Sequence, residues 1–262
     1  MRFVVFSKRS VIAVAVAVAV MAGIVAAACV SASVRAVASN GMTIVIDPGH
    51  GGADGGVVGT DTGKKEADVN LGISLSLRHF LREAGYTVVM TRDSDVDLAS
   101  PGESFKQSDM RRRKEIIEQA QPDLVVSVHQ NYYPLRSVSG AQVFYFEGAE
   151  TSADYAERMQ NILNAALDCD RAAKSADYYI LGCTPYPGVL VECGFMSNAR
   201  EESLLVTPEY QRKVAYAVYS GIVALLEWDS SVARSARFPY GASAAAFGEP
   251  VTFSGHGGVT QP

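Results

Sequence analysis

The sequence predicts an α/β fold: a single domain in which a twisted, mostly parallel sheet is flanked by helices on both faces. Between Met42 and Trp228, short apolar runs alternate with longer segments whose apolar residues recur at helical spacing, as in chains of βαβ units. Three of the apolar runs end in a histidine or a glutamate. In an open α/β sheet the carboxyl ends of the strands form the usual ligand site, so these side chains are candidates for chemistry.

The elements follow from the apolar pattern and its interruptions. We expect strands over residues 43–45, 86–90, 124–128, 141–146 and 189–191. We expect helices over 65–84, 108–120, 153–167 and 208–228. Gly85 and Pro122 are natural stops for the first two helices, and Pro208 is tolerated in the first turn of the last one.

Two terminal segments flank this predicted domain of residues 42–228. Basic residues precede the uncharged stretch from Val11 to Val34, so residues 1–38 are predicted to be a signal peptide or an N-terminal membrane anchor. Both alternatives stay open, because the small residues of Ala36-Val-Ala38 suit cleavage but lie unusually late. Residues 229–262 are rich in Ser, Ala and Gly, and we expect a flexible C-terminal tail there.

Composition argues against several classes of protein. The formal net charge is −5 and becomes more negative without the leader, which disfavours nucleic acid as a partner. Beyond the leader there are only three cysteines, too few for a disulfide framework: Cys169, Cys183 and Cys193. The glycine-rich stretch 49–56 lacks the Lys and Ser or Thr of a phosphate-binding loop, which argues against nucleotide binding.

Two histidines at strand ends suggest a metal site. His50 lies where the first strand breaks into a glycine-rich loop, and His129 directly follows the strand at 124–128. Catalytic zinc commonly takes three protein ligands from His, Asp and Glu. Glu66, at the start of the first helix, is one candidate for the carboxylate. Spacing does not exclude four others: Asp47, Asp54, Asp61 and Asp68.

Glu192 and Asn131 are further candidates. Glu192 follows three apolar residues in a buried strand, where a carboxylate is costly unless it is paired or catalytic, so near a metal it would be a general base. Ser127, His129 and Asn131 alternate and should share a face, which makes Asn131 a candidate for substrate binding. We expect most of the run Arg111–Lys114 to be a solvated helix face.

These residues fall in four motifs, in the order Ile46-Asp-Pro-Gly-His50-Gly-Gly52, Lys65-Glu66, Ser127-Val-His129-Gln-Asn131 and Val191-Glu192-Cys-Gly-Phe-Met-Ser-Asn198. The pattern, with Thr91-Arg-Asp93 between, resembles the zinc-dependent N-acetylmuramoyl-L-alanine amidases of the amidase-3 type. The resemblance covers Met42 to about Trp228. It implies that His50, Glu66 and His129 hold Zn²⁺ and that Glu192 is the catalytic base.

A narrower resemblance concerns the branch of the family. The stretch Thr91–Pro101 and the segment Ser139–Gln142 resemble the spore-cortex, CwlD-like amidases, which strip peptide stems from muramic acid. Arg113 stands where the family usually has an arginine, but Ile117-Glu118 replaces the common Ala-Asn after it.

The predicted function is hydrolysis of the amide between N-acetylmuramic acid and L-alanine in peptidoglycan by a zinc-activated water. The alternatives are a non-catalytic module that binds peptidoglycan or a partner, and another zinc hydrolase such as a deacetylase or carboxypeptidase. An activating or zinc-loading protein is an expected partner, and the membrane is another if residues 1–38 stay attached. We expect the protein at the cell wall or the outer face of the membrane, with the forespore envelope as the specific case.

Overall fold

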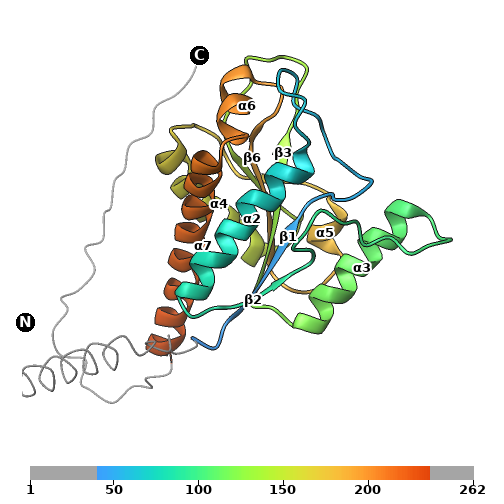
Figure 1. Cartoon of the computed structure of the whole chain (residues 1–262). Coiled ribbons are helices and arrows are strands. Elements are labelled where there is room, and N and C mark those ends of the chain that lie inside the picture. The colour runs from blue at the N-terminus through green and yellow to red at the C-terminus, as the bar shows by residue number, and fades with distance from the viewer. Residues whose placement is uncertain (1–39, 237–262) are drawn as a thin grey trace, which may run out of the picture.

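A six-stranded sheet forms the centre of the computed structural model, which describes residues 40–236 (Figure 1). The strand order is β2-β1-β3-β6-β4-β5. The strands are β1 Thr43–Pro48, β2 Thr87–Met90, β3 Leu124–Asn131, β4 Gln142–Tyr145, β5 Lys174–Ser175 and β6 Gly188–Phe195. All neighbours are parallel except β4 and β6. The predicted fold class, a mostly parallel α/β sheet, is confirmed.

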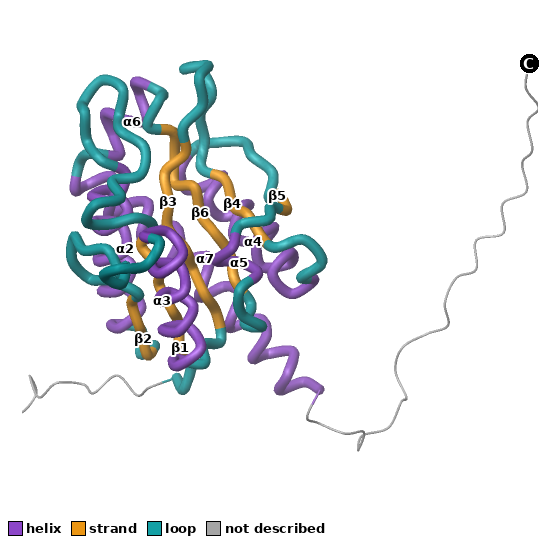
Figure 2. The backbone as a smooth tube through the Cα atoms, turned by 90° about the vertical axis from the view of Figure 1, so that its right-hand side faces the viewer, coloured by secondary structure: helices purple, strands orange, loops and turns teal. Residues whose placement is uncertain are grey.

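Helices cover both faces of the sheet (Figures 1 and 2). On one face lie α2 Glu66–Glu83, α4 Glu150–Leu167 and α7 Pro208–Ala236. On the other lie α3 Phe105–Ala120 and the short α5 Tyr179–Gly182. A further helix, α6 Ala199–Leu205, follows β6. Among the helices of residues 40–236, none combines the length and the apolar character that crossing a membrane requires.

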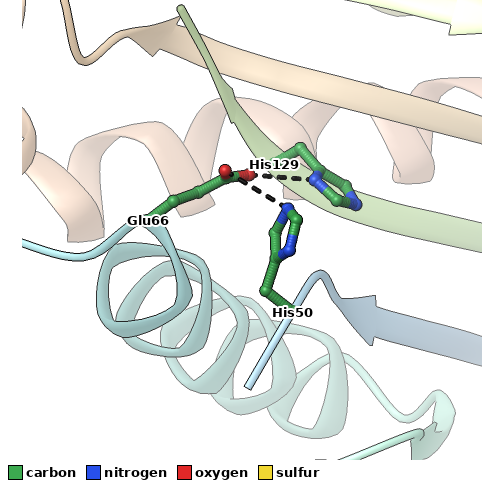
Figure 3. A group of neighbouring side chains, drawn as sticks. All are labelled: His50, Glu66 and His129. Atoms are coloured by element: carbon green, nitrogen blue, oxygen red, sulfur yellow. Dashed lines mark hydrogen bonds and ion pairs between the residues drawn. The ribbon is translucent and has the colours of Figure 1, made fainter. Parts of the chain in front are cut away.

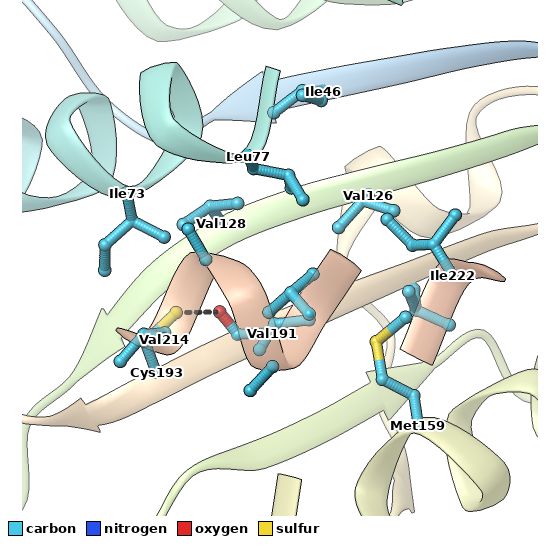
Figure 4. Close-up of a cluster of buried hydrophobic side chains, with 14 of the residues drawn as sticks. Ile46, Ile73, Leu77, Val126, Val128, Met159, Val191, Cys193, Val214 and Ile222 are labelled. Atoms are coloured by element: carbon cyan, nitrogen blue, oxygen red, sulfur yellow. Dashed lines mark hydrogen bonds between the residues drawn. The ribbon is translucent and has the colours of Figure 1, made fainter. Parts of the chain in front are cut away.

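The central strands β1, β3 and β6 contain long apolar runs because both of their faces are buried. Val126 and Val128 of β3 pack into the larger core beneath α2, α4 and α7 (Figure 4). Val125 packs on the other face, toward α3 and α5. Leu77 of α2 is fully buried against the first group. Such double burial explains why the sequence shows continuous apolar runs instead of alternation.

The parallel pairing brings three strand ends to one edge of the sheet. Pro48 of β1 pairs with Val128 of β3, and His129 pairs with Glu192 of β6. His129 and Glu192 alternate with Val128 and Val191, so both face the α3 and α5 side. The register therefore places the candidate chemical groups next to one another.

Several boundaries differ from the sequence prediction. Helix α3 begins at Phe105 rather than Ser108, and α4 at Glu150 rather than Ala153. Helix α7 continues to Ala236, so the prediction of a tail from residue 229 is wrong for 229–236, where no glycine or proline interrupts the helix. The predicted leader and the tail beyond residue 236 lie outside the described residues. The short elements α5, α6 and β5 have too few residues to show a period.

Candidate metal centre and active site

Three side chains from three segments meet at the carboxyl edge of the sheet (Figure 3). His50 comes from the loop after β1, Glu66 from the first turn of α2, and His129 from β3. One carboxylate oxygen of Glu66 lies 2.9 Å from His129 Nδ1, and the other lies 3.2 Å from His50 Nε2. One potential ligand atom from each residue lies within 4.8 Å of the others. The two imidazoles and the carboxylate could therefore hold one metal ion.

The geometry selects Glu66 from the five carboxylates that the sequence left open. The four others are engaged elsewhere: the partners of Asp47, Asp54, Asp61 and Asp68 are Arg113, His50 Nδ1, Arg136 and Lys64, respectively. Asp54 does contact a histidine of the cluster, at 2.8 Å, but through the ring nitrogen that does not face Glu66. A carboxylate in that position orients the imidazole, as the outer partners of metal-bound histidines do.

Glu66 is held as a charged group. The side chain is buried, and it accepts hydrogen bonds from the backbone N–H groups of Val57 and Gln130 at 3.0 Å each. Burial alone would raise the pKa of Glu66, but its hydrogen bonds with His129 and His50 outweigh burial and keep that pKa well below its usual range. A permanently ionised carboxylate is what a metal ligand requires.

The glycines of the loop make room for this cluster. A Cβ atom on Gly49 would lie 2.2 Å from Cε1 of His129, and one on Gly56 would lie 2.5 Å from Oε2 of Glu66. His50 itself has a φ of 60°, in the left-handed region that non-glycine residues seldom adopt. The glycine-rich stretch thus serves close packing around His50, Glu66 and His129.

Glu192 lies beside this cluster with one oxygen unused. Its side chain is 8% exposed, and its Oε2 atom is buried with no hydrogen-bond partner among the described residues. Burial raises the pKa of Glu192 to about 7, and His129 opposes the shift only in part. A carboxylate that titrates near neutral pH is suited to accept and return a proton.

A cavity of about 190 Å³ opens from Glu192 between α3 and α5. His50, His129 and Glu192 line its inner end. Its walls are mainly apolar and include Phe105, Lys106, Met110, Tyr178, Tyr179 and Ile180. The cluster is therefore accessible from one direction, through a passage with apolar sides.

Comparisons with known proteins identify the family of the chain. Residues 44–224 match the sequence profile of the Amidase_3 family, described as N-acetylmuramoyl-L-alanine amidase. The chain belongs to this family. It is 39% identical over 191 residues to the germination-specific N-acetylmuramoyl-L-alanine amidase of Bacillus subtilis, covering 70% of this chain and 79% of that protein. It is 34% identical over 186 residues to LytC of the same organism, covering 70% of this chain and 35% of LytC.

Solved structures give the same result. The CwlD amidase of Clostridioides difficile, in complex with the GerS lipoprotein, superposes with a TM-score of 0.69 at 36% identity and covers 72% of this chain and all of that one. The catalytic domain of CwlV, an amidase from Bacillus (Paenibacillus) polymyxa, superposes with a TM-score of 0.63 at 29% identity, covering 71% and 98%. The predicted enzyme class, an N-acetylmuramoyl-L-alanine amidase of the CwlD-like branch, is confirmed.

Two buried arginines hold the histidine loop of this amidase. Arg113 of α3 pairs with Asp47 and Asp109 at 2.7 Å each and donates to the backbone carbonyls of Pro48 and His50. Arg92 donates to the carbonyls of Pro48, Gly49 and Ala67, so it joins the loop to the first turn of α2. These bonds fix the backbone on both sides of His50.

Sequence reasoning missed part of this support. Arg113 was recognised only as a family position within a run expected to be mostly solvated, yet it is 2% exposed. The signal was Asp109, four residues earlier, which places a carboxylate on the same face of the helix. For Arg92 the indication of a structural role in the sequence was weaker: it is the middle residue of the motif Thr91-Arg-Asp93, whose role the sequence did not reveal.

Asn131 lies apart from the cavity. The register of β3 and β6 shifts between His129 and Asn131, so the alternation that should align them is broken. The Asn131 Oδ1 atom accepts from the backbone N–H of Tyr132 at 2.8 Å. The proposed role of Asn131 in substrate binding stays a prediction.

Ser127 donates a hydrogen bond to the carboxylate of Asp47 at 2.7 Å and so supports the Arg113 network.

Replacing Arg113 by methionine should lower the free energy of unfolding by about 3–5 kcal/mol, because Asp47 and Asp109 would stay buried without their cation. The matched control is Arg112→Met on the same helix, where the side chain is 52% exposed and pairs with Glu115. This control should change stability by less than about 0.5 kcal/mol. Urea unfolding of both variants measures the difference, and equal losses would contradict the structural role of Arg113.

Because the pKa of Glu192 is raised, the free energy of unfolding of the metal-free protein should fall as the pH rises. The unfolded glutamate loses its proton near its ordinary pKa, whereas the folded one holds it up to about pH 7, so folding loses stability as pH rises through this window. Glu192→Gln should therefore be more stable than the wild type by about 1–3 kcal/mol at about pH 8, and by much less at about pH 5. A difference independent of pH in urea unfolding with chelator would refute this.

Proposed function

We propose that this amidase cleaves the amide between the lactyl group of N-acetylmuramic acid and L-alanine by means of a water molecule activated by Zn²⁺. The observation that carries the proposal is the meeting of His50, Glu66 and His129 beside an unpartnered Glu192 oxygen. Two imidazoles and one carboxylate are a donor set of catalytic zinc sites. When bound, zinc would lower the pKa of a water molecule and polarise the substrate carbonyl.

The protein's own groups account for the proton movements. Glu192 in its charged form takes a proton from the attacking water at Oε2. It then delivers a proton to the leaving nitrogen, so the products are the lactyl carboxylate and the free amine of the stem peptide. Glu66 keeps its charge throughout, because its hydrogen bonds hold its pKa low. Asp54 and the arginine-bound loop keep His50 in orientation.

The biological setting is a further part of the proposal. Similarity to a germination-specific amidase and to CwlD supports a role in maturation of the spore cortex. The CwlD structure is a complex with the GerS lipoprotein, which supports a protein partner for this chain as well. Residues 1–38 would direct export to the cell wall or the outer face of the membrane, in the sporulating cell at the forespore envelope.

Mass spectrometry of digested peptidoglycan tests the activity and the base together. With zinc, the protein should release intact stem peptides, and a chelator should abolish release. Glu192→Gln should reduce the rate by at least about 100-fold, because the proton acceptor is gone, while zinc content stays at the wild-type level. Release of acetate or of a single amino acid would point to a deacetylase or a carboxypeptidase. Near-normal activity of the zinc-loaded variant would refute the role of Glu192.

Gly49→Ala tests the metal centre separately from turnover. The new methyl group would displace the His129 ring, so zinc affinity should fall by at least about tenfold, the range found when groups that orient metal ligands are changed. Gly55→Ala is the matched control in the same loop, since its methyl group would meet only the flexible side chain of Lys65. Zinc titration of both variants reads out the effect, and equal affinities would argue against His129 as a ligand.

A further inference from the structure

Lys106 is a cation at the cavity that the proposed reaction does not use. It lies in the first turn of α3 and lines the same cavity as His50, His129 and Glu192. Its side chain is exposed, and within residues 40–236 it makes no hydrogen bond and no ion pair. Its charge is therefore available to a ligand that enters the cavity.

The other cationic groups of the cavity are already engaged. Arg113 is paired with Asp47 and Asp109, and the two histidines face Glu66 and Asp54. Asp54 is half-exposed, and Lys106 acts on it only through the longer-range field that helps to lower the Asp54 pKa. Among the described residues that line the cavity, Lys106 is thus the cation without a close counter-charge.

The stability of α3 does not account for a lysine at this position. The first turn of a helix carries a partial positive charge, so a cation there is disfavoured. No side chain caps the start of α3, and its first turn contains no acidic residue. Lys106 and the helix start therefore place positive charge on one side of the cavity, where an anionic group of the substrate could bind.

Apolar and aromatic side chains of the cavity wall lie between Lys106 and Glu192. Phe105, Tyr178 and Tyr179 are partly exposed around the cavity, and the charge of Glu192 contributes, after burial, to raising the pKa of Tyr178. Tyr178 thus interacts electrostatically with Glu192, and Phe105 is the sequence neighbour of Lys106. A short peptide could lie between the scissile bond and Lys106 against apolar side chains.

Peptidoglycan stems present an anion at a suitable place. The residue after L-alanine is a γ-linked D-glutamate, whose α-carboxylate is free in some walls and amidated in others. We propose that Lys106 binds this α-carboxylate, so that the cavity between α3 and α5 holds the peptide side of the scissile bond and selects unamidated stems. The inference rests on the proposed function, since it needs the stem peptide as substrate.

The test uses two synthetic glycan–tripeptide fragments that differ only in this α-carboxylate or α-carboxamide. The zinc-loaded full-length protein should cleave the acid with a kcat/KM about three- to tenfold higher than the amide at low salt, in the range expected for an ion pair at a protein surface or slightly buried. High salt should reduce the preference, because it screens exposed charges. Lys106→Met should cleave both fragments equally, and Lys106→Arg should keep a preference for the acid.

Lys114→Met is the control for the loss of one positive charge from α3. Lys114 pairs with Glu118 and does not line the cavity, so this variant should keep the wild-type preference. Cleavage of both fragments by the wild type without preference would overturn the inference alone. The inference would also be overturned if Lys106→Met lowered kcat/KM by the same factor for both fragments and so kept the preference for the acid. Lys106 would then act on the catalytic groups through Asp54. Absence of cleavage of either fragment by the wild type would overturn the proposed function as well.

Discussion

The buried contact between Arg113 and Asp47 is the interaction on which the site depends. Asp47 is a buried residue near the end of β1, and Arg113 of α3 pairs with it at 2.7 Å. The same guanidinium donates to the backbone carbonyls of Pro48 and His50, and Arg92 donates to those of Pro48 and Gly49. With these carbonyls fixed, the backbone at His50 can keep its left-handed conformation, and strain at a functional residue persists only where its surroundings enforce it.

The pKa values of two buried glutamates of the site are shifted in opposite directions. Glu66 receives hydrogen bonds from two imidazoles and two backbone N–H groups, so its charged form is stabilised despite burial. Glu192 lies nearby with one oxygen unpartnered, and burial therefore dominates its pKa. Enzymes separate the roles of paired titratable groups by such differences of environment. The arrangement suits one glutamate to bind a cation and the other to move protons.

The position of the site follows from the sheet. Parallel pairing of β1, β3 and β6 places their carboxyl ends at one edge, and the first turn of α2 closes over this edge with Glu66. The other helices of that face form the larger core, whereas α3 and α5 leave a passage on the opposite face. One layer of helices thus provides stability, and the other provides access and the positively charged rim at Lys106.

The sequence alone determined the α/β fold class, the longer strands and helices in chain order, the two histidines and Glu192, because continuous apolar runs and the residues that end them are local features of the chain. The choice of Glu66 over four aspartates came from the family resemblance and then from the folded structure, since spacing does not say which carboxylate a loop returns to the edge. Only the tertiary structure decided that Arg113 is buried, that the pairing register shifts between His129 and Asn131, and that Lys106 lines the cavity. These outcomes depend on contacts between segments far apart in the chain, and the local hydrophobic periodicity of the sequence does not predict such contacts.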